Sequence, residues 1–127
     1  MKKPEDILGK WLSCVNNADI EGLLSLYHED AVLIPTFSNR LLCTPERIRE
    51  YFERLTARDE LSIALHEKTL LTQKFGQDMY LVCGIYCWRF AIDDELLSFE
   101  ARFSYSLNLS LEKPITHHHS SQIPRTL

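Results

Sequence analysis

The sequence contains no apolar run that approaches the roughly 18 residues needed for a membrane-spanning helix. The N-terminal stretch MKKPEDILGKWL places acidic residues directly after two lysines and lacks the continuous apolar segment of a secretory signal peptide. These two absences predict a cytoplasmic protein that has no membrane partner.

Positive charge is also scarce. The chain carries 14 Lys and Arg against 18 Asp and Glu, which gives a formal net charge of −4 and a pI near 5.7. Proteins that bind nucleic acid or anionic membrane surfaces usually carry a basic excess. We therefore expect neither kind of partner.

Motifs for disulfide, metal and nucleophile chemistry are missing as well. The four cysteines form no CxxC pair, which predicts reduced and mostly buried thiols. His117 and His119 share a face of a predicted strand, but a zinc site needs at least one further protein ligand and none lies nearby in the sequence. No GxSxG turn accompanies Ser120 or Ser121, so a serine triad is not expected. We predict no metal and no cofactor.

The sequence has the composition of a globular domain. Its 127 residues are 45% hydrophobic and 25% charged, which suits one domain with one core over residues 1–127. The last few residues, Pro124 to Leu127, are expected to fray.

Helical patterns fill the first half of the chain. The spacing of Ile7, Leu8 and Trp11 predicts a helix over 4–17, and Asp19 is a suitable N-cap for a shorter helix that includes Tyr27. The stretch TPERIREYFERL predicts a third helix, with Thr44 as the cap and Pro45 at the first position. A short strand is expected in EDAVLIP, and a loop over 36–43 with a small strand at 40–43.

Strand patterns fill the second half. Three segments, about 61–75, 78–92 and 95–111, are rich in β-branched and aromatic residues, and a last strand follows in ITHHHSSQI. Alternation puts Arg102 on the polar face of its strand, and it separates His118 and Ser120 from His117, His119 and Ser121. Helices followed by paired strands predict an α+β fold in which N-terminal helices pack on a strongly curved antiparallel sheet.

Four stretches carry a resemblance to a known family: LLSLYHEDAVLIPT, TPERIREYFERL, FEARFSYSL and THHHSSQIP. In this order and spacing they are similar to the nuclear transport factor 2-like, or cystatin-like, superfamily. Within it the chain most resembles the branch that holds the association domain of calcium/calmodulin-dependent protein kinase II and small stand-alone bacterial proteins. The resemblance covers nearly the whole chain and implies a cone with a pocket at its wide end.

The sequence departs from that branch in two places. SLEKP replaces the usual Asp-Gly turn and the tryptophan that follows it. In the kinase domain several arginines line the pocket. Arg102 matches one of them, but Tyr86 and Ser120 stand where the others are expected. The resemblance implies that Arg102 lines the pocket. Its planar guanidinium group would then bind a carboxylate through paired N–H donors.

The candidate ligand-binding residues are therefore Arg102, Tyr86, His118, His119 and Ser120. From the strand pattern alone, Arg102 has an alternative role as a solvated residue or as the ion-pair partner of Glu100. The sequence leaves open which face of 117–121 lines the pocket. No catalytic residue is assigned.

Three functions remain open from the sequence. The first is a domain that binds a small organic acid, and the second is an isomerase-, dehydratase- or cyclase-type enzyme with a His or carboxylate base. The second is the less favoured, because few acidic side chains are placed to serve as a base. The third is an oligomerisation module without ligand chemistry. Apolar side chains on both faces of strand 78–92 further predict a homodimer through the sheet face.

Overall fold

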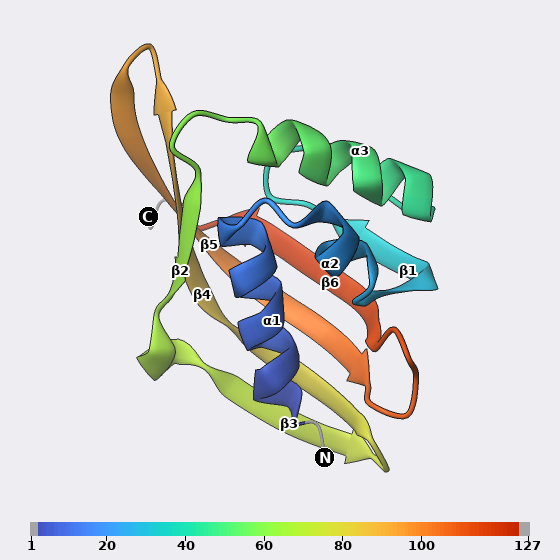
Figure 1. Ribbon diagram of the computed structural model, residues 1–127. Coiled ribbons are helices and arrows are strands. Elements are labelled where there is room, and N and C mark those ends of the chain that lie inside the picture. The colour runs from blue at the N-terminus through green and yellow to red at the C-terminus, as the bar shows by residue number, and fades with distance from the viewer. Residues whose placement is uncertain (1–2, 125–127) are drawn as a thin grey trace.

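The computed structural model describes residues 3–124 and contains three α-helices packed on one face of a curved six-stranded sheet (Figure 1). The elements in chain order are α1 (Pro4–Asn16), α2 (Ile20–Leu24), β1 (Tyr27–Ile34), α3 (Pro45–Thr56), β2 (Ser62–Leu65), the short 3-10 helix η1 (Glu67–Thr69), β3 (Leu71–Gly76), β4 (Met79–Ile92), β5 (Glu95–Asn108) and β6 (Ile115–Gln122). The predicted α+β class is confirmed. The fraying expected at 125–127 lies outside the described residues.

The predicted helix starts are confirmed by their caps. The Thr44 hydroxyl accepts a hydrogen bond from the Arg47 amide at 3.3 Å, and Pro45 occupies the first position of α3. Asp19 accepts from the Gly22 amide at 2.8 Å and caps α2. Each cap satisfies an amide that the helix itself leaves without a partner.

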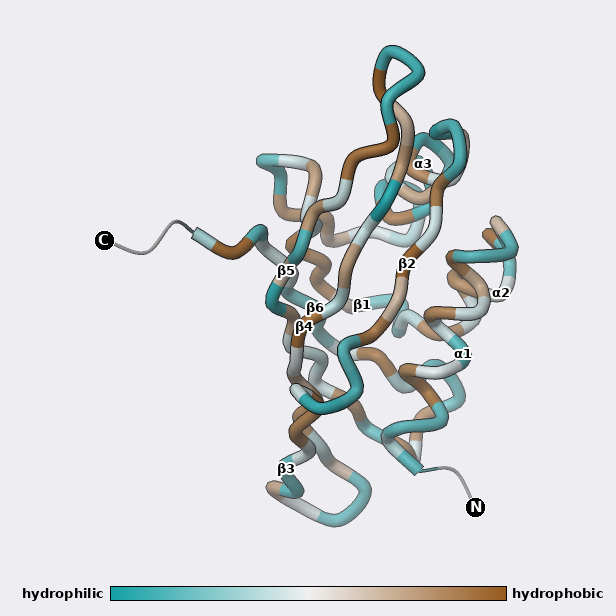
Figure 2. Tube along the Cα trace, turned by 90° about the vertical axis from the view of Figure 1, so that its left-hand side faces the viewer, coloured by the Kyte–Doolittle hydropathy of each residue, from teal (hydrophilic) through white to brown (hydrophobic). Residues whose placement is uncertain are grey.

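The sheet runs in the order β1-β6-β5-β4-β2, with β3 also paired to β4. All neighbours are antiparallel except β1 and β6, which are parallel. The predicted antiparallel sheet is therefore correct for every pair but this one. The helices all lie on one side of the sheet, and no described helix covers the other side (Figure 2).

Three local predictions were wrong. Tyr27 was expected in the second helix but begins β1, where it pairs with Ile115. The strand expected over 61–75 is broken by η1, and the Thr69 hydroxyl there accepts a hydrogen bond from the Ile85 amide at 2.8 Å. The small strand expected at 40–43 is a single bridge between Leu33 and Leu42. In the first two cases a contact distant in sequence replaces the locally favoured structure.

The predicted strand faces hold throughout the long strands. The buried set, which faces the helices, comprises Val82, Tyr86, Trp88 and Phe90 on β4, Ala101, Phe103, Tyr105 and Leu107 on β5, and His118 and Ser120 on β6. The structure thus decides which face of 117–121 looks inward. His118 and Ser120 do, while His117 and His119 belong to the opposite face.

Candidate functional site

A buried chain of hydrogen bonds crosses the interior of the fold. The Trp11 indole N–H donates to the Tyr27 hydroxyl at 2.9 Å, and that hydroxyl lies 2.7 Å from Nδ1 of His118. Nε2 of His118 lies 3.2 Å from the Tyr86 hydroxyl. Every link is satisfied if Tyr27 donates to Nδ1 and His118 donates from Nε2, so a neutral imidazole fits the site.

Burial keeps this chain uncharged. It lowers the pKa of His118 well below the usual histidine value, and positive charge on His117 and His119 would lower it further. Burial also raises the pKa of Tyr27 and of Tyr86 above the ordinary tyrosine range. Within residues 3–124 no carboxylate hydrogen bonds to or ion pairs with His118. His118 therefore lacks the carboxylate partner that would orient a histidine for acid–base catalysis.

Aromatic rings fill the space around His118. The Tyr105 ring stacks on the imidazole with a centroid distance of 3.9 Å, and Trp11 meets it edge-on at 5.3 Å. Two cavities, the larger of which is described below, are not lined by His118, Tyr86 or Ser120. These three side chains are at most 2% exposed and belong to the packed interior.

The predicted site residues divide between the two faces of the sheet. Tyr86, His118 and Ser120 are all buried on the inner face, and Ser120 Oγ lies 2.5 Å from Thr36 Oγ1. Arg102 and His119 are exposed on the outer face, where Arg102 is in register with Ser121 of β6.

Arg102 therefore does not line the interior, contrary to the expectation from the family resemblance. The reason is the alternation of β5, which turns the odd-numbered apolar side chains toward the helices and the even-numbered ones outward. The alternative ion pair with Glu100 is not formed either. Glu100 instead lies 3.4 Å from Nε2 of His66, and both side chains are about half exposed.

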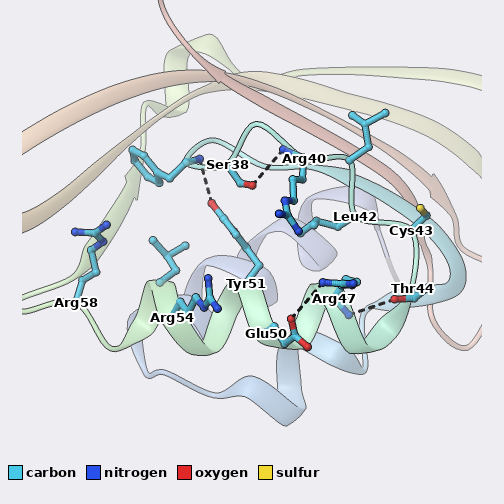
Figure 3. Close-up of a pocket in the computed structure, with 13 residues that line it drawn as sticks. Ser38, Arg40, Leu42, Cys43, Thr44, Arg47, Glu50, Tyr51, Arg54 and Arg58 are labelled. Carbon is cyan, nitrogen blue, oxygen red and sulfur yellow. Dashed lines mark hydrogen bonds and ion pairs between the residues drawn. The ribbon is translucent and has the colours of Figure 1, made fainter.

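The larger cavity lies elsewhere, between α3 and the segment 36–43 (Figure 3). It measures about 880 Å³, and we call it the arginine groove. Four of its lining residues are arginines, and Glu50 is its one acidic residue. The lining comprises Phe37, Ser38, Arg40, Leu41, Leu42, Cys43, Thr44, Arg47, Glu50, Tyr51, Arg54, Leu55 and Arg58.

The groove arginines are weakly engaged. Arg47 meets Glu50 at 3.9 Å with both side chains more than half exposed, so this pair contributes little. Arg58 places its guanidinium carbon 4.8 Å from the centre of the Phe90 ring. Within the described part of the chain, Arg40 and Arg54 form no ion pair. The groove is thus a pocket of largely unneutralised positive charge on an acidic protein.

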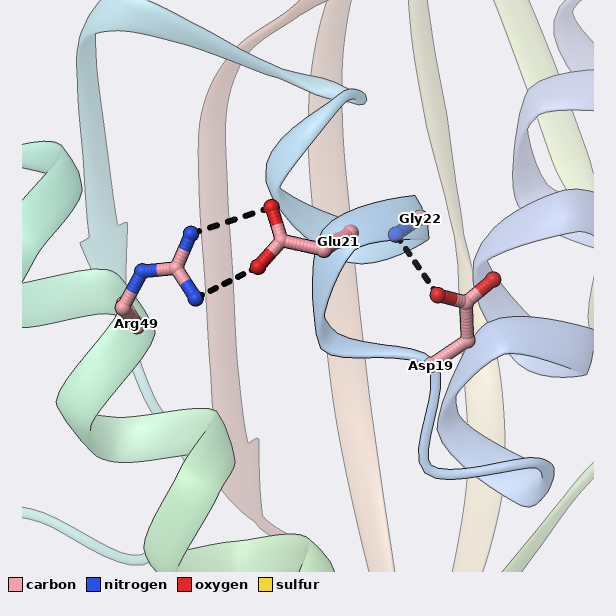
Figure 4. Close-up of polar contacts among 4 residues, drawn as sticks. All are labelled: Asp19, Glu21, Gly22 and Arg49. Carbon is pink, nitrogen blue, oxygen red and sulfur yellow. Dashed lines mark hydrogen bonds and ion pairs between the residues drawn. The ribbon is translucent and has the colours of Figure 1, made fainter.

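Arg49 shows the contrasting case on the same helix. It points away from the groove toward α2 and binds both carboxylate oxygens of Glu21, at 2.7 and 3.1 Å (Figure 4). The ion pair raises the pKa of Arg49 and lowers the pKa of Glu21. This arginine joins α3 to α2, whereas the groove arginines have no comparable partner.

The groove was not predicted from the sequence, although the sequence contains part of the pattern that forms it. Arg47, Tyr51 and Arg54 recur at i, i+4 and i+7, which places them on one face of α3, and Arg58 follows in the turn after the helix. Arg40 could not be added from the sequence, because its position depends on how the loop 36–43 folds over that face.

Phe37 forms the boundary between the groove and the core. It lines the groove, its amide donates to the Tyr51 hydroxyl at 3.3 Å, and its side chain is partly buried. Its ring meets Trp88, Phe90 and Phe99 edge-on, with centroid distances of 5.7, 5.4 and 5.6 Å. Phe37 therefore contacts both the cationic pocket and the aromatic interior.

Metal-ligand clusters and membrane-spanning helices are both absent from the described residues. No group of three or more His, Cys, Asp or Glu side chains within residues 3–124 is arranged to hold a metal ion. Over the same residues, no helix has the length and apolar character needed to cross a membrane.

Comparison with known proteins identifies the family. The profile of the SnoaL-like domain matches residues 5–126. The chain belongs to the SnoaL-like domain family. No curated protein gives a significant match to this SnoaL-like domain. The predicted membership in the nuclear transport factor 2-like superfamily is confirmed by this match and by the structures that share the fold.

Three solved structures illustrate the similarity. A Xanthomonas campestris protein described as a calcium/calmodulin dependent protein kinase II association domain has a TM-score of 0.85 and 22% identity, over 96% of this chain and 86% of that one. A Streptomyces avermitilis protein described as a dehydratase of the NTF2-like family has a TM-score of 0.79 and 13% identity, over 95% and 94%. A Shewanella putrefaciens protein described as a SnoaL-like polyketide cyclase has a TM-score of 0.65 and 16% identity, over 96% and 90%. At these identities the SnoaL-like domain shares a fold with all three, and the differing descriptions show that the fold alone does not fix a function.

Proposed function

We propose that this SnoaL-like domain binds a small organic anion, such as a carboxylate, in the arginine groove. The observation that carries the proposal is a cavity of about 880 Å³ lined by four arginines and one acidic residue, on a chain whose net charge is −4. Guanidinium groups bind carboxylates through paired, charge-assisted hydrogen bonds. The ligand class expected from the sequence is retained, while the arginines that hold it are those of the groove and not Arg102.

Substitution of Arg54 tests this proposal. Arg54→Gln is expected to weaken the binding of a small carboxylate by about tenfold or more, because it removes a charged donor that has no ion-pair partner in the described structure. Isothermal titration with benzoate, repeated at higher salt, measures the change. A rise in melting temperature with benzoate concentration provides an independent readout of binding to the folded state.

Arg102→Gln is the matched control, since it removes another exposed arginine, from the outer face of the sheet. Its affinity for benzoate is expected to equal that of the wild type. The proposal would be overturned by benzoate binding that survives Arg54→Gln and is lost in Arg102→Gln, or by no binding to the wild type at millimolar concentration.

An acid–base enzyme is supported less well. Its best candidate base is His118, which is buried, is held between two tyrosine hydroxyls and lines neither cavity. A substrate would need to displace the core to reach it.

We also propose that two copies associate through the outer face of the sheet. Register and alternation place Leu71, Leu81, Cys83, Ile85 and Cys87 on that face, and Leu71 and Leu81 are 64% and 37% exposed. No described helix covers these strands on that side (Figure 2). Burial of such a face against a second copy removes apolar surface from water.

The wild type is accordingly expected to sediment as a dimer at about 10 μM, a concentration typical for such measurements. Leu81→Glu places a charge in the apolar face and should shift the protein to the monomer. Leu41→Glu, at a leucine that is 65% exposed in the groove lining and away from this face, should leave the dimer intact. A wild type that sediments as a monomer would refute the association.

A further inference from the structure

Phe37 belongs both to the lining of the arginine groove and to an aromatic cluster of the interior. Phe37 lies in a seat formed by Trp88, Phe90 and Phe99, each of which meets its ring at between 73° and 84°. Phe37 itself is only partly buried, and it belongs to a loop whose next residues, Ser38 to Leu41, line the groove or are exposed. Rotation of one side chain would therefore open the seat to the groove.

A charged group already lies beside this aromatic seat. The guanidinium carbon of Arg58 is 4.8 Å from the centre of the Phe90 ring, and the Phe90 ring centre is 5.4 Å from that of Phe37. Arg58 and Phe37 thus contact the same ring, and both line the groove. One small molecule could occupy both positions if it carries its anionic group directly on a planar ring.

The wall of the seat also contains a polar group that lacks a partner. Trp88 is 1% exposed, and its indole N–H has no hydrogen-bond acceptor in the described structure. A buried donor without an acceptor is costly, and such groups are rare in folded proteins. A ligand acceptor atom within hydrogen-bond distance of this N–H would satisfy it.

We propose that the ligand of the groove is an aryl carboxylate whose ring takes the seat of Phe37 against Trp88, Phe90 and Phe99. The carboxylate stays with the groove arginines, and an acceptor substituent on the ring takes the hydrogen bond of the Trp88 indole N–H. A benzene ring has the size of the phenylalanine ring that it displaces, so the seat is refilled without a void. This inference rests on the proposed function and adds to it the class of ligand and the residues that select it.

Benzoate and cyclohexanecarboxylate have the same charge and the same number of carbon atoms, and only the first has an aromatic ring. Comparing their affinities therefore tests the aromatic seat apart from the charge. Wild-type protein is expected to bind benzoate about three- to tenfold more tightly than cyclohexanecarboxylate, because edge-to-face contacts with the seat favour an aromatic ring beyond its area. Phe37→Ala empties the seat and should strengthen benzoate binding by about tenfold, while propionate binding changes less than twofold. Phe75→Ala, the same change at an exposed phenylalanine of β3 outside the groove lining, should change neither affinity.

Trp88→Phe tests the hydrogen bond while it keeps a ring in the wall. The wild type is expected to prefer 4-methoxybenzoate to benzoate by about fivefold, and the variant should lose this preference. Titration calorimetry supplies every affinity, and the wild-type comparison stands even where Phe37→Ala proves unstable.

The outcomes distinguish the aryl seat from the anion binding on which it rests. Equal affinity of the wild type for benzoate and cyclohexanecarboxylate, with Arg54→Gln weakening both, would overturn the aryl seat and leave anion binding in place. The absence of any arginine-dependent binding would overturn both.

Discussion

Trp11→Ala is expected to lower the free energy of unfolding by about 4 kcal/mol, which is a large share of the stability of a small domain. Trp11 is 1% exposed, and its ring packs against five others. It stacks on Tyr86 with a centroid distance of 5.5 Å and an interplanar angle of 9°. The substitution would leave a large cavity between α1 and the sheet, and neighbouring rings cannot collapse into it without losing their own contacts.

The hydrogen bond from Trp11 can be measured separately from its packing. Trp11→Phe retains an aromatic ring but removes the indole N–H that the Tyr27 hydroxyl accepts, so a smaller loss of about 1–2 kcal/mol is expected. Lys10→Ala, at an exposed position of the same helix, should change stability by less than about 0.5 kcal/mol. Chemical denaturation monitored by circular dichroism gives all three values. A loss below about 1 kcal/mol for Trp11→Ala would mean that this ring does not hold the helix to the sheet.

Periodicity predicted the parts of the fold that depend on one element at a time. The caps at Asp19 and Thr44 form as expected, because each is a contact within four residues of the chain. The two faces of β4 and β5 were also predictable, since side chains must alternate along a strand. Local sequence was insufficient where a distant partner decides the structure. Tyr27 joins a strand because β6 lies beside it, and the strand expected over 61–75 is interrupted where Thr69 bonds to Ile85.

The candidate site was harder to predict than the fold, because it depends on contacts between segments that are distant in sequence. The resemblance to known relatives predicted that Arg102 lines the pocket. The position of Arg102 on β5 instead places its side chain on the outer face of the sheet. The arginines that do gather around a cavity come from one face of α3, from the turn after it and from a loop folded over that face. The helix face alone is equally compatible with a solvated surface, so only the packing of segment 36–43 converts it into a groove. The sequence therefore could not predict that these arginines form a pocket, because the pocket depends on how α3 and segment 36–43 pack together.

Below about pH 6.5, the usual pKa of histidine, the stability of the protein is expected to fall because of His118. Burial lowers the pKa of His118 in the folded state, whereas the unfolded chain binds a proton at the ordinary value. The unfolded state therefore holds more protons than the folded state as the pH drops through 6.5, and each further unit removes up to about 1.4 kcal/mol of unfolding free energy. Between pH 6.5 and pH 5 this amounts to at most about 2 kcal/mol.

Variants on β6 isolate this contribution from the other titrating groups. His118→Leu is less stable than the wild type at pH 7, because the Tyr27 and Tyr86 hydroxyls lose a partner, yet its stability should fall less steeply between pH 6.5 and pH 5. His119→Gln removes an exposed histidine from the neighbouring position and should retain the wild-type slope. Denaturation curves at a series of pH values give the three slopes. Parallel slopes for wild type and His118→Leu would show that His118 accepts a proton as readily in the folded core as in water, and the neutral hydrogen-bonded chain through Trp11, Tyr27 and Tyr86 would then be the wrong description of the interior.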